Sequence, residues 1–124
     1  MKLIGAQVEL FRNIIDSTPV EIQPDVTCLV GKNESGKTAF LHALYRLNPA
    51  RPNAPLNLSQ QYPAWRIKQD RVAGGSLEDV HPIRARFTLE ASDVAALERR
   101  FGANVLASDD ITVWRAYSGA THIY

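Results

Sequence analysis

One segment of this 124-residue chain has the residue types and spacing for phosphate chemistry. Residues 31–38 read Gly-Lys-Asn-Glu-Ser-Gly-Lys-Thr, which matches the phosphate-loop pattern G-x-x-x-x-G-K-[ST]. The two glycines allow backbone conformations that a Cβ forbids, so that successive N–H groups can point at one anion. The predicted phosphate-binding residues are Gly31, Asn33, Glu34, Ser35, Gly36, Lys37, Thr38 and Ala39.

Two side chains of this loop carry specific chemistry. Lys37 adds a full positive charge for the β- and γ-phosphates and stabilises charge during transfer, so it is the predicted catalytic residue. Thr38 offers a hydroxyl to Mg²⁺ and is the predicted metal ligand. The expected cofactors are therefore ATP and Mg²⁺, although no base-reading motif separates ATP from GTP. The competing interpretation is a strand-turn-helix corner with a surface lysine, which does not require this pattern.

The loop needs a strand before it and a helix after it. Residues 26–30 read Val-Thr-Cys-Leu-Val, an apolar run that predicts a central strand buried on both faces, with Cys28 as inert packing. Residues 39–47 place Phe40, Leu44 and Leu47 on one face of a helix, which the Asn-Pro pair at 48–49 ends.

The remaining segments predict an antiparallel β section. Alternating apolar residues indicate strands over 2–10 and 83–89, and shorter strands are expected over 20–23 and 111–117. Ser92 is expected to cap a helix with Val94, Leu97 and Phe101 inward and Gly102 as its stop. The segment 49–63, with four prolines, is expected to be an irregular loop.

Composition narrows the class of protein. The chain is 45% hydrophobic and 22% charged with a net charge of +1, which is typical of one globular domain and not of a disordered tail. No run approaches the ~20 apolar residues that span a bilayer, so no membrane partner is expected. One cysteine cannot form an internal disulfide, which favours the cytoplasm.

Two stretches also resemble a known family. Phe11-Arg12-Asn13-Ile14 and residues 29–41 resemble the amino-terminal opening of ABC-type ATPase heads, in the group that includes the SMC, RecF and OLD ATPases. The phosphate loop is most similar to that of OLD-type and related bacterial AAA family ATPases, and residues 84–102 and 111–117 resemble their β-rich insertion. The resemblance implies an α/β fold, a P-loop NTPase core with an added antiparallel β section. It also places Arg12 and Asn13 near the nucleotide, and it implies action in DNA repair, DNA processing or anti-phage defence.

A complete head of this family has further motifs that the sequence does not present. Residues 72–76 lack the order of a signature loop, and the paired acids near residues 109–110 are better explained as a turn than as a Walker B strand. We therefore expect the amino-terminal portion of a larger head, comprising a P-loop lobe (1–48), a loop-rich insertion (49–82) and a β-rich section (83–124). Hydrolysis is expected to need the rest of the head and a second head in a homodimer.

A different class of function stays open beside ATP binding. Residues 46–71 hold five basic side chains against one acid, with Tyr62 and Trp65 among them. Basic charge interleaved with aromatic rings is typical of nucleic-acid binding, and equally of a solvated loop that packs on its own rings. In this alternative, the chain is a non-catalytic module that binds DNA or another partner through residues 46–71. A third class, another P-loop enzyme such as a kinase, has no acceptor-site motif in this sequence.

Overall fold

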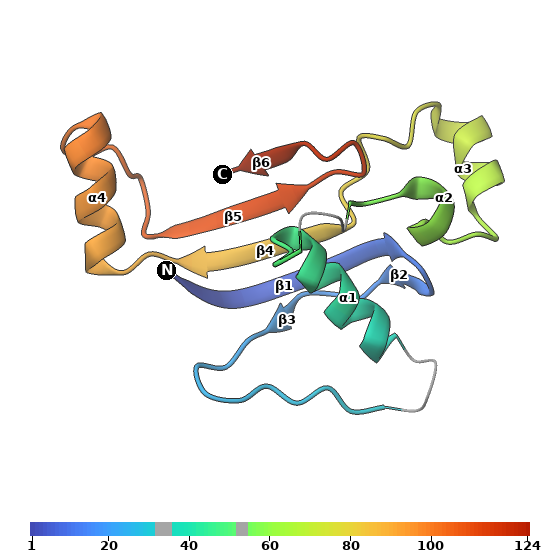
Figure 1. The fold of residues 1–124 in the computed structure, drawn as a ribbon, viewed down its shortest axis with the longest axis horizontal. Helices are drawn as coiled ribbons and strands as arrows, with labels where there is room; N and C mark the ends of the chain where they lie inside the picture. The colour runs from blue at the N-terminus through green and yellow to red at the C-terminus, as the bar shows by residue number, and fades with distance from the viewer. Residues whose placement is uncertain (32–35, 52–54) are drawn as a thin grey trace.

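The computed structural model of the chain describes residues 1–31, 36–51 and 55–124. Within these residues an antiparallel sheet carries a helix on one face, and further helices lie at its two ends (Figure 1). The elements are β1 (Lys2–Phe11), β2 (Ile14–Asp16), β3 (Val20–Glu21), α1 (Lys37–Leu47), α2 (Leu58–Gln61), α3 (Ile67–Gly74), β4 (Ile83–Thr88), α4 (Ala91–Phe101), β5 (Asp110–Arg115) and β6 (Thr121–Ile123). None of the helices in these ranges is long and apolar enough to cross a bilayer.

The sheet is built around β1. Its strand order is β2-β1-β4-β5-β6, and β3 also pairs with β1. Every pairing recorded for the described residues is antiparallel. Figure 1 shows α4 linking β4 to β5 at one end of the sheet, while α2 and α3 lie at the other end. The α/β class and the antiparallel section expected from the sequence are therefore observed.

One face of the sheet is apolar and carries α1. The register sets Ala6 opposite Ala85 and Val8 opposite Ile83, so buried residues of β1 and β4 meet on the same face. Phe40 of α1 packs in the same buried cluster as Val8 and Ile83. The alternation expected in the second strand is seen in β4, and the inward face of the helix after the phosphate loop is confirmed. The alternation expected for residues 2–10 is interrupted, because the register shifts between Leu3 and Gly5 and Leu10 packs on a different cluster from Val8.

The end of β1 divides its side chains between two clusters. Leu10 and Arg12 have φ angles of 50° and 54°, in the left-handed region that residues with a Cβ seldom adopt. Between them, Phe11 is fully buried in the main cluster under α1, whereas Leu10 packs on a second cluster that includes Tyr62 and Tyr117. This change of direction brings the two clusters together beside the start of β2.

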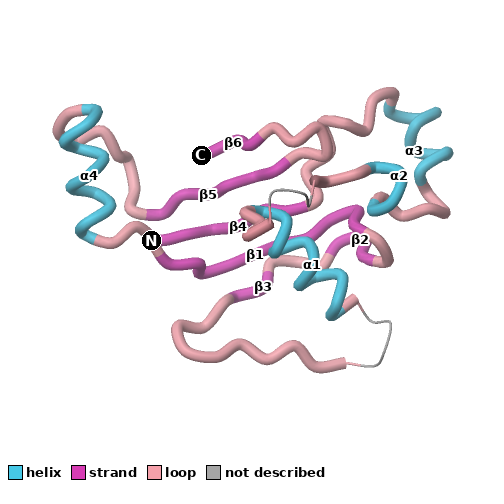
Figure 2. Tube along the Cα trace, in the orientation of Figure 1, coloured by secondary structure: helices cyan, strands magenta, loops and turns pink. Residues whose placement is uncertain are grey.

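The prediction of a strand over residues 26–30 is wrong. This segment has no strand structure and runs as loop between β3 and α1 (Figure 2). Val26 is 72% exposed, Val30 is 93% exposed, and Cys28 is exposed rather than buried. A strand buried on both faces needs paired neighbours and covering layers. No strand pairing within the described ranges includes this segment, so Val26 and Val30 face solvent, whereas Leu29 is partly buried against the main cluster.

Two local expectations for the second half also differ. The helix α4 begins two residues earlier than expected, because Glu90 and not Ser92 is its N-cap and forms a capping box with Asp93. Phe101 is 62% exposed instead of inward, while Gly102 ends the helix with a φ of 102° as expected.

The segment expected to be irregular over 49–63 contains the short helix α2, which Asn57 caps through the amides of Ser59 and Gln60.

Candidate functional site

The start of α1 forms the centre of the candidate site. Gly36 is the residue before the helix, with φ 98° and ψ 2°. A Cβ at this position would lie 3.0 Å from Cγ1 of Ile14, so both the backbone conformation and the available space require glycine. Glycine has no side chain with which to cap the first N–H groups, and the first turn has no acidic residue. These N–H groups and the positive end of the helix dipole therefore favour an anion.

Lys37 links the two ends of the loop. Its side chain is half-buried, and its ammonium donates a hydrogen bond to the carbonyl oxygen of Gly31. Thr38 is exposed at the same helix end, and Ala39 is buried beneath it. The structure thus brings Gly31, Gly36, Lys37, Thr38 and Ala39 together at the position that the motif predicts. The predicted residues Asn33, Glu34 and Ser35 lie outside the described residues.

A cavity of about 460 Å³ opens beside this helix end. Three segments line it: the start of α1, the loop before it, and the turn from β1 through β2. The lining residues are Asn13, Ile14, Ile15, Asp16, Ser17, Val20, Leu29, Val30, Gly31, Gly36, Lys37 and Phe40. The cavity therefore combines the cation of Lys37, the carboxylate of Asp16 and an uncapped helix end with an apolar wall.

Of the two residues that the family resemblance placed near the nucleotide, only one lines the cavity. Asn13 lines the cavity, but Arg12 is not among the lining residues. The guanidinium of Arg12 lies 5.7 Å from the centre of the Phe11 ring, and that of Arg46 lies 5.9 Å from the same ring. The pKa of Arg46 is lowered mainly by burial and to a smaller extent by the positive charge of Arg12. The pKa of His42 is also lowered mainly by burial, with smaller contributions from the charges of Arg12 and Arg46. Arg12 thus joins a group of cations along α1.

Sequence reasoning missed Asp16 and Ser17 as cavity residues. The carboxylate of Asp16 accepts hydrogen bonds from Nε2 of Gln7 at 2.9 Å and from the amide of Thr18 at 2.7 Å. These bonds lower the pKa of Asp16, the one from Gln7 most, so the group is ionised at neutral pH. Asp16 ends β2 and Ser17 follows it, and their place beside the cavity depends on the pairing of β2 with β1, which local sequence does not indicate.

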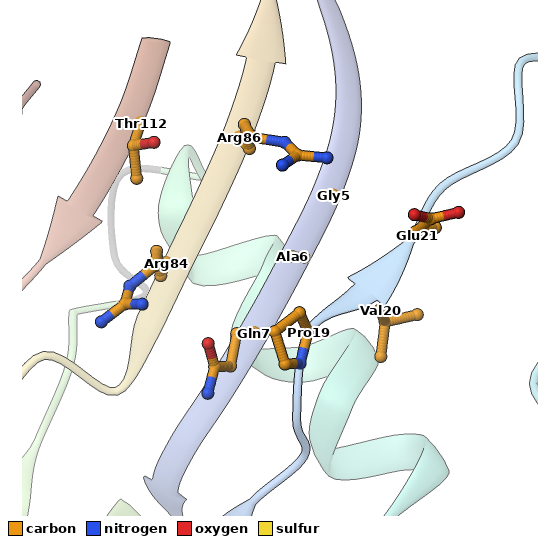
Figure 3. A pocket seen from close by; sticks show the side chains of 9 residues that line it. All are labelled: Gly5, Ala6, Gln7, Pro19, Val20, Glu21, Arg84, Arg86 and Thr112. Carbon is orange, nitrogen blue, oxygen red and sulfur yellow. The ribbon is translucent and has the colours of Figure 1, made fainter. Parts of the chain in front are cut away.

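The opposite face of the sheet holds a second cavity, of about 350 Å³ (Figure 3). Arg84 and Arg86 extend from β4 on this face, beside Gln7 of β1 and Thr112 of β5. The guanidinium of Arg84 lies 4.2 Å from the ring centre of Trp114, a cation–π contact. This face is a second basic surface that the sequence analysis did not single out.

The basic segment 46–71 is only partly open. Tyr62 is buried, and its hydroxyl donates to Asp70 at 2.6 Å. Burial and, to a smaller extent, this hydrogen bond raise the pKa of Tyr62 to about 12. Arg66 forms an ion pair with the same carboxylate at 3.3 Å. Only Trp65, which is 71% exposed, presents an aromatic ring to solvent, so the two rings expected to lie among the cations do not form one surface.

Comparison with known proteins identifies relatives of this arrangement. A family model described as an AAA ATPase domain matches residues 1–98. The DNA replication and repair protein RecF of Staphylococcus haemolyticus is 40% identical over 57 residues. That match covers 46% of this chain and 15% of the relative, so the chain spans a small part of the length of that relative.

A solved structure supports the same fold. It comes from work on ATP-driven dimerization and DNA-stimulated activation of SMC ATPases, and it superposes with a TM-score of 0.53 at 17% identity. The similarity covers 100% of this chain and 69% of that chain. At this level of identity the likeness is one of fold alone.

Proposed function

The chain belongs to the AAA ATPase domain family, and from this premise we propose that it binds ATP with Mg²⁺ in the cavity beside α1. One observation carries the proposal. The ammonium of Lys37 and the uncapped start of α1 lie at one end of a cavity that Gly31 and Gly36 border. Helix N-termini with an adjacent lysine are suited to phosphate groups.

Each residue has a defined part in this proposal. Lys37 exchanges its bond to the Gly31 carbonyl for phosphate oxygens, and the first amides of α1, including that of Ala39, donate to the same groups. Thr38 holds Mg²⁺, which when bound neutralises phosphate charge. Asn13 borders the sugar or base, while Arg12 adds positive potential from outside the cavity. Asn33, Glu34 and Ser35 are proposed to contact the phosphates through their backbone amides.

We further propose that the chain acts as the amino-terminal portion of an ABC-type head. The proposed parts are the P-loop lobe (1–48), the loop-rich insertion (49–82) and the β-rich section (83–124). Leu41 and Tyr45 are exposed, and their spacing puts them on one face of α1, where we propose that the rest of the head packs. Hydrolysis then requires that remaining part and a second head in a homodimer.

The biological setting follows from the relatives. One relative is named a DNA replication and repair protein, and the structural neighbour comes from work on DNA-stimulated ATPases. We propose a role in DNA repair or processing, with anti-phage defence as the further possibility from the OLD resemblance, in the cytoplasm. DNA is accordingly the proposed macromolecular partner.

A calorimetric titration tests the ATP proposal directly. The chain is expected to bind a non-hydrolysable ATP analogue in the presence of Mg²⁺, with less binding when Mg²⁺ is removed. It is also expected to hydrolyse ATP far more slowly than a complete head, because the second lobe is needed for chemistry. A titration without heat or saturation refutes the nucleotide proposal. A steady-state ATPase rate equal to that of a complete head refutes the requirement for further parts.

DNA binding through a basic surface is the second candidate function. Lys68 and Arg71 are exposed on α3, and Arg84 and Arg86 border the cavity of the open sheet face. If either surface binds DNA, changing its two cations to alanine should weaken binding several-fold. It should also lower the slope of log affinity against log salt by about 2, because two phosphate contacts are lost.

The matched control for this experiment is on α4. Arg99 and Arg100 are exposed, so the double alanine variant removes the same charge from a distant helix. Fluorescence anisotropy with single-stranded and duplex oligonucleotides measures all three double variants. Equal loss in all three variants would mean that only net charge matters, and no loss in the α3 variant would refute the module based on residues 46–71.

A further inference from the structure

The end of β5 holds the far end of the candidate nucleotide-binding helix. Arg115 is the last residue of β5, and its Nη1 donates to the carbonyl oxygens of Arg46 at 3.2 Å and Leu47 at 2.8 Å. These carbonyls belong to the last turn of α1, where no further helical turn supplies a donor. A cation at this position also complements the negative end of the helix dipole. Arg115 therefore ties α1 to the sheet.

A second side chain from the same end of β5 holds the opposite wall of the cavity. Tyr117 is 4% exposed, and its hydroxyl donates to the carbonyl oxygen of Leu10 at 2.6 Å. Leu10 has a φ of 50° and begins the change of direction that leads to Asn13 and Ile14. Burial raises the pKa of Tyr117, so the hydroxyl stays protonated and able to donate at physiological pH. Tyr117 therefore holds the turn between β1 and β2.

We propose that Arg115 and Tyr117 form a clamp that positions the two walls of the nucleotide cavity. This proposal rests on the proposed ATP site. One wall is the start of α1 with Gly36 and Lys37, and the other is the turn with Asn13. Both clamp residues lie beyond residue 98, where the family match ends, so the positioning comes from outside the matched segment.

The clamp acts through rigid elements. α1 has 11 residues and one continuous set of helical bonds, so a tilt at its last turn moves the amides at its first turn. The hydroxyl of Tyr117 fixes a carbonyl in a strained stretch, where the backbone has alternative conformations of lower strain. Sites that bind phosphate through several amides tolerate only small displacements of those amides.

Three substitutions test the clamp in the full chain. Tyr117→Phe removes only the hydroxyl, Arg115→Met removes the donors but keeps the stem, and Arg115→Lys returns one cationic donor. Tyr117→Phe and Arg115→Met should each weaken binding of the Mg²⁺–ATP analogue about threefold to tenfold, the range for one or two lost hydrogen bonds. Arg115→Lys should recover part of the loss, which a packing role alone would not produce.

The controls are Tyr124→Phe and Arg100→Met, which alter exposed residues of the same types. Amide hydrogen exchange without nucleotide is measured on every variant. The clamp predicts faster exchange in residues 40–47 for Arg115→Met and in residues 11–14 for Tyr117→Phe, with β4 unchanged. Thermal unfolding identifies any variant that is not folded, and the decision then rests on the other clamp variant, because Tyr117→Phe and Arg115→Met each remove an independent hydrogen-bond contact.

The outcomes separate the two proposals. If the unchanged chain binds no nucleotide, the ATP proposal fails, and the exchange data still decide whether the clamp exists. If it binds, but folded Tyr117→Phe and Arg115→Met match its affinity and its exchange pattern, the clamp is refuted. A loss of affinity with local exchange in the two named segments supports the clamp.

Discussion

Lys37→Ala should lower the affinity for the Mg²⁺–ATP analogue by about 100-fold or more. The ammonium lies at the mouth of the cavity on the Gly31 carbonyl, the position from which it reaches phosphate oxygens. Charge-assisted hydrogen bonds contribute about 1.5–3 kcal/mol each, and two such bonds correspond to about 10²- to 10⁴-fold in affinity. Isothermal calorimetry on both chains measures the difference.

The stability of this variant should change little. Alanine is a better helix former than lysine, and Lys37 is half-buried without a carboxylate partner among the described residues. A Tm within a few degrees of the unchanged chain shows that any loss of binding comes from the site. Lys68→Ala on α3 is the matched control, because it removes an equal charge from an exposed helix. Equal affinities for Lys37→Ala and the unchanged chain would contradict the assignment.

Local patterns predicted the elements that hold the site. The alternation in residues 2–10 and 83–89 and the helical spacing of Phe40, Leu44 and Leu47 each depend on neighbours close in sequence. The same holds for Gly36, whose conformation is fixed by its place before the helix and whose φ of 98° was implied by the motif. These features could be predicted from the sequence because a few neighbouring residues determine each of them.

The failures have a shared physical cause. Whether Val26–Val30 forms a strand depends on partners from distant segments, and an apolar run cannot indicate whether those partners are present. Asp16 borders the cavity only through its pairing with Glu9, and the bonds of Arg115 and Tyr117 cross 68 and 107 residues of sequence. Contacts of that range leave no periodic signal in the sequence.

Gly36→Ala should destabilise the chain by about 2–3 kcal/mol and weaken nucleotide binding as well. For a residue with a Cβ, the left-handed conformation costs about 1–2 kcal/mol of stability. The added Cβ would also lie 3.0 Å from Cγ1 and 3.4 Å from Cδ1 of Ile14, which must shift within the buried core. Urea unfolding measures the free energy, and calorimetry measures the affinity.

Two other glycines serve as references without a steric contact. Gly102 has a φ of 102° with nothing within 4 Å of a built Cβ, so Gly102→Ala should show a backbone cost of its own without a clash. Gly74 ends α3 with open space and no positive φ, so Gly74→Ala should be neutral or stabilise by about 0.5–1 kcal/mol. Gly36 has a ψ of 2° and Gly102 a ψ of 166°, so their backbone costs differ, and a double-mutant cycle isolates the contact with Ile14. The loss caused by Gly36→Ala should be smaller in a chain that already carries Ile14→Ala. Equal losses in both chains would show that the contact with Ile14 relaxes at no cost, and only the backbone would then require glycine at the start of α1.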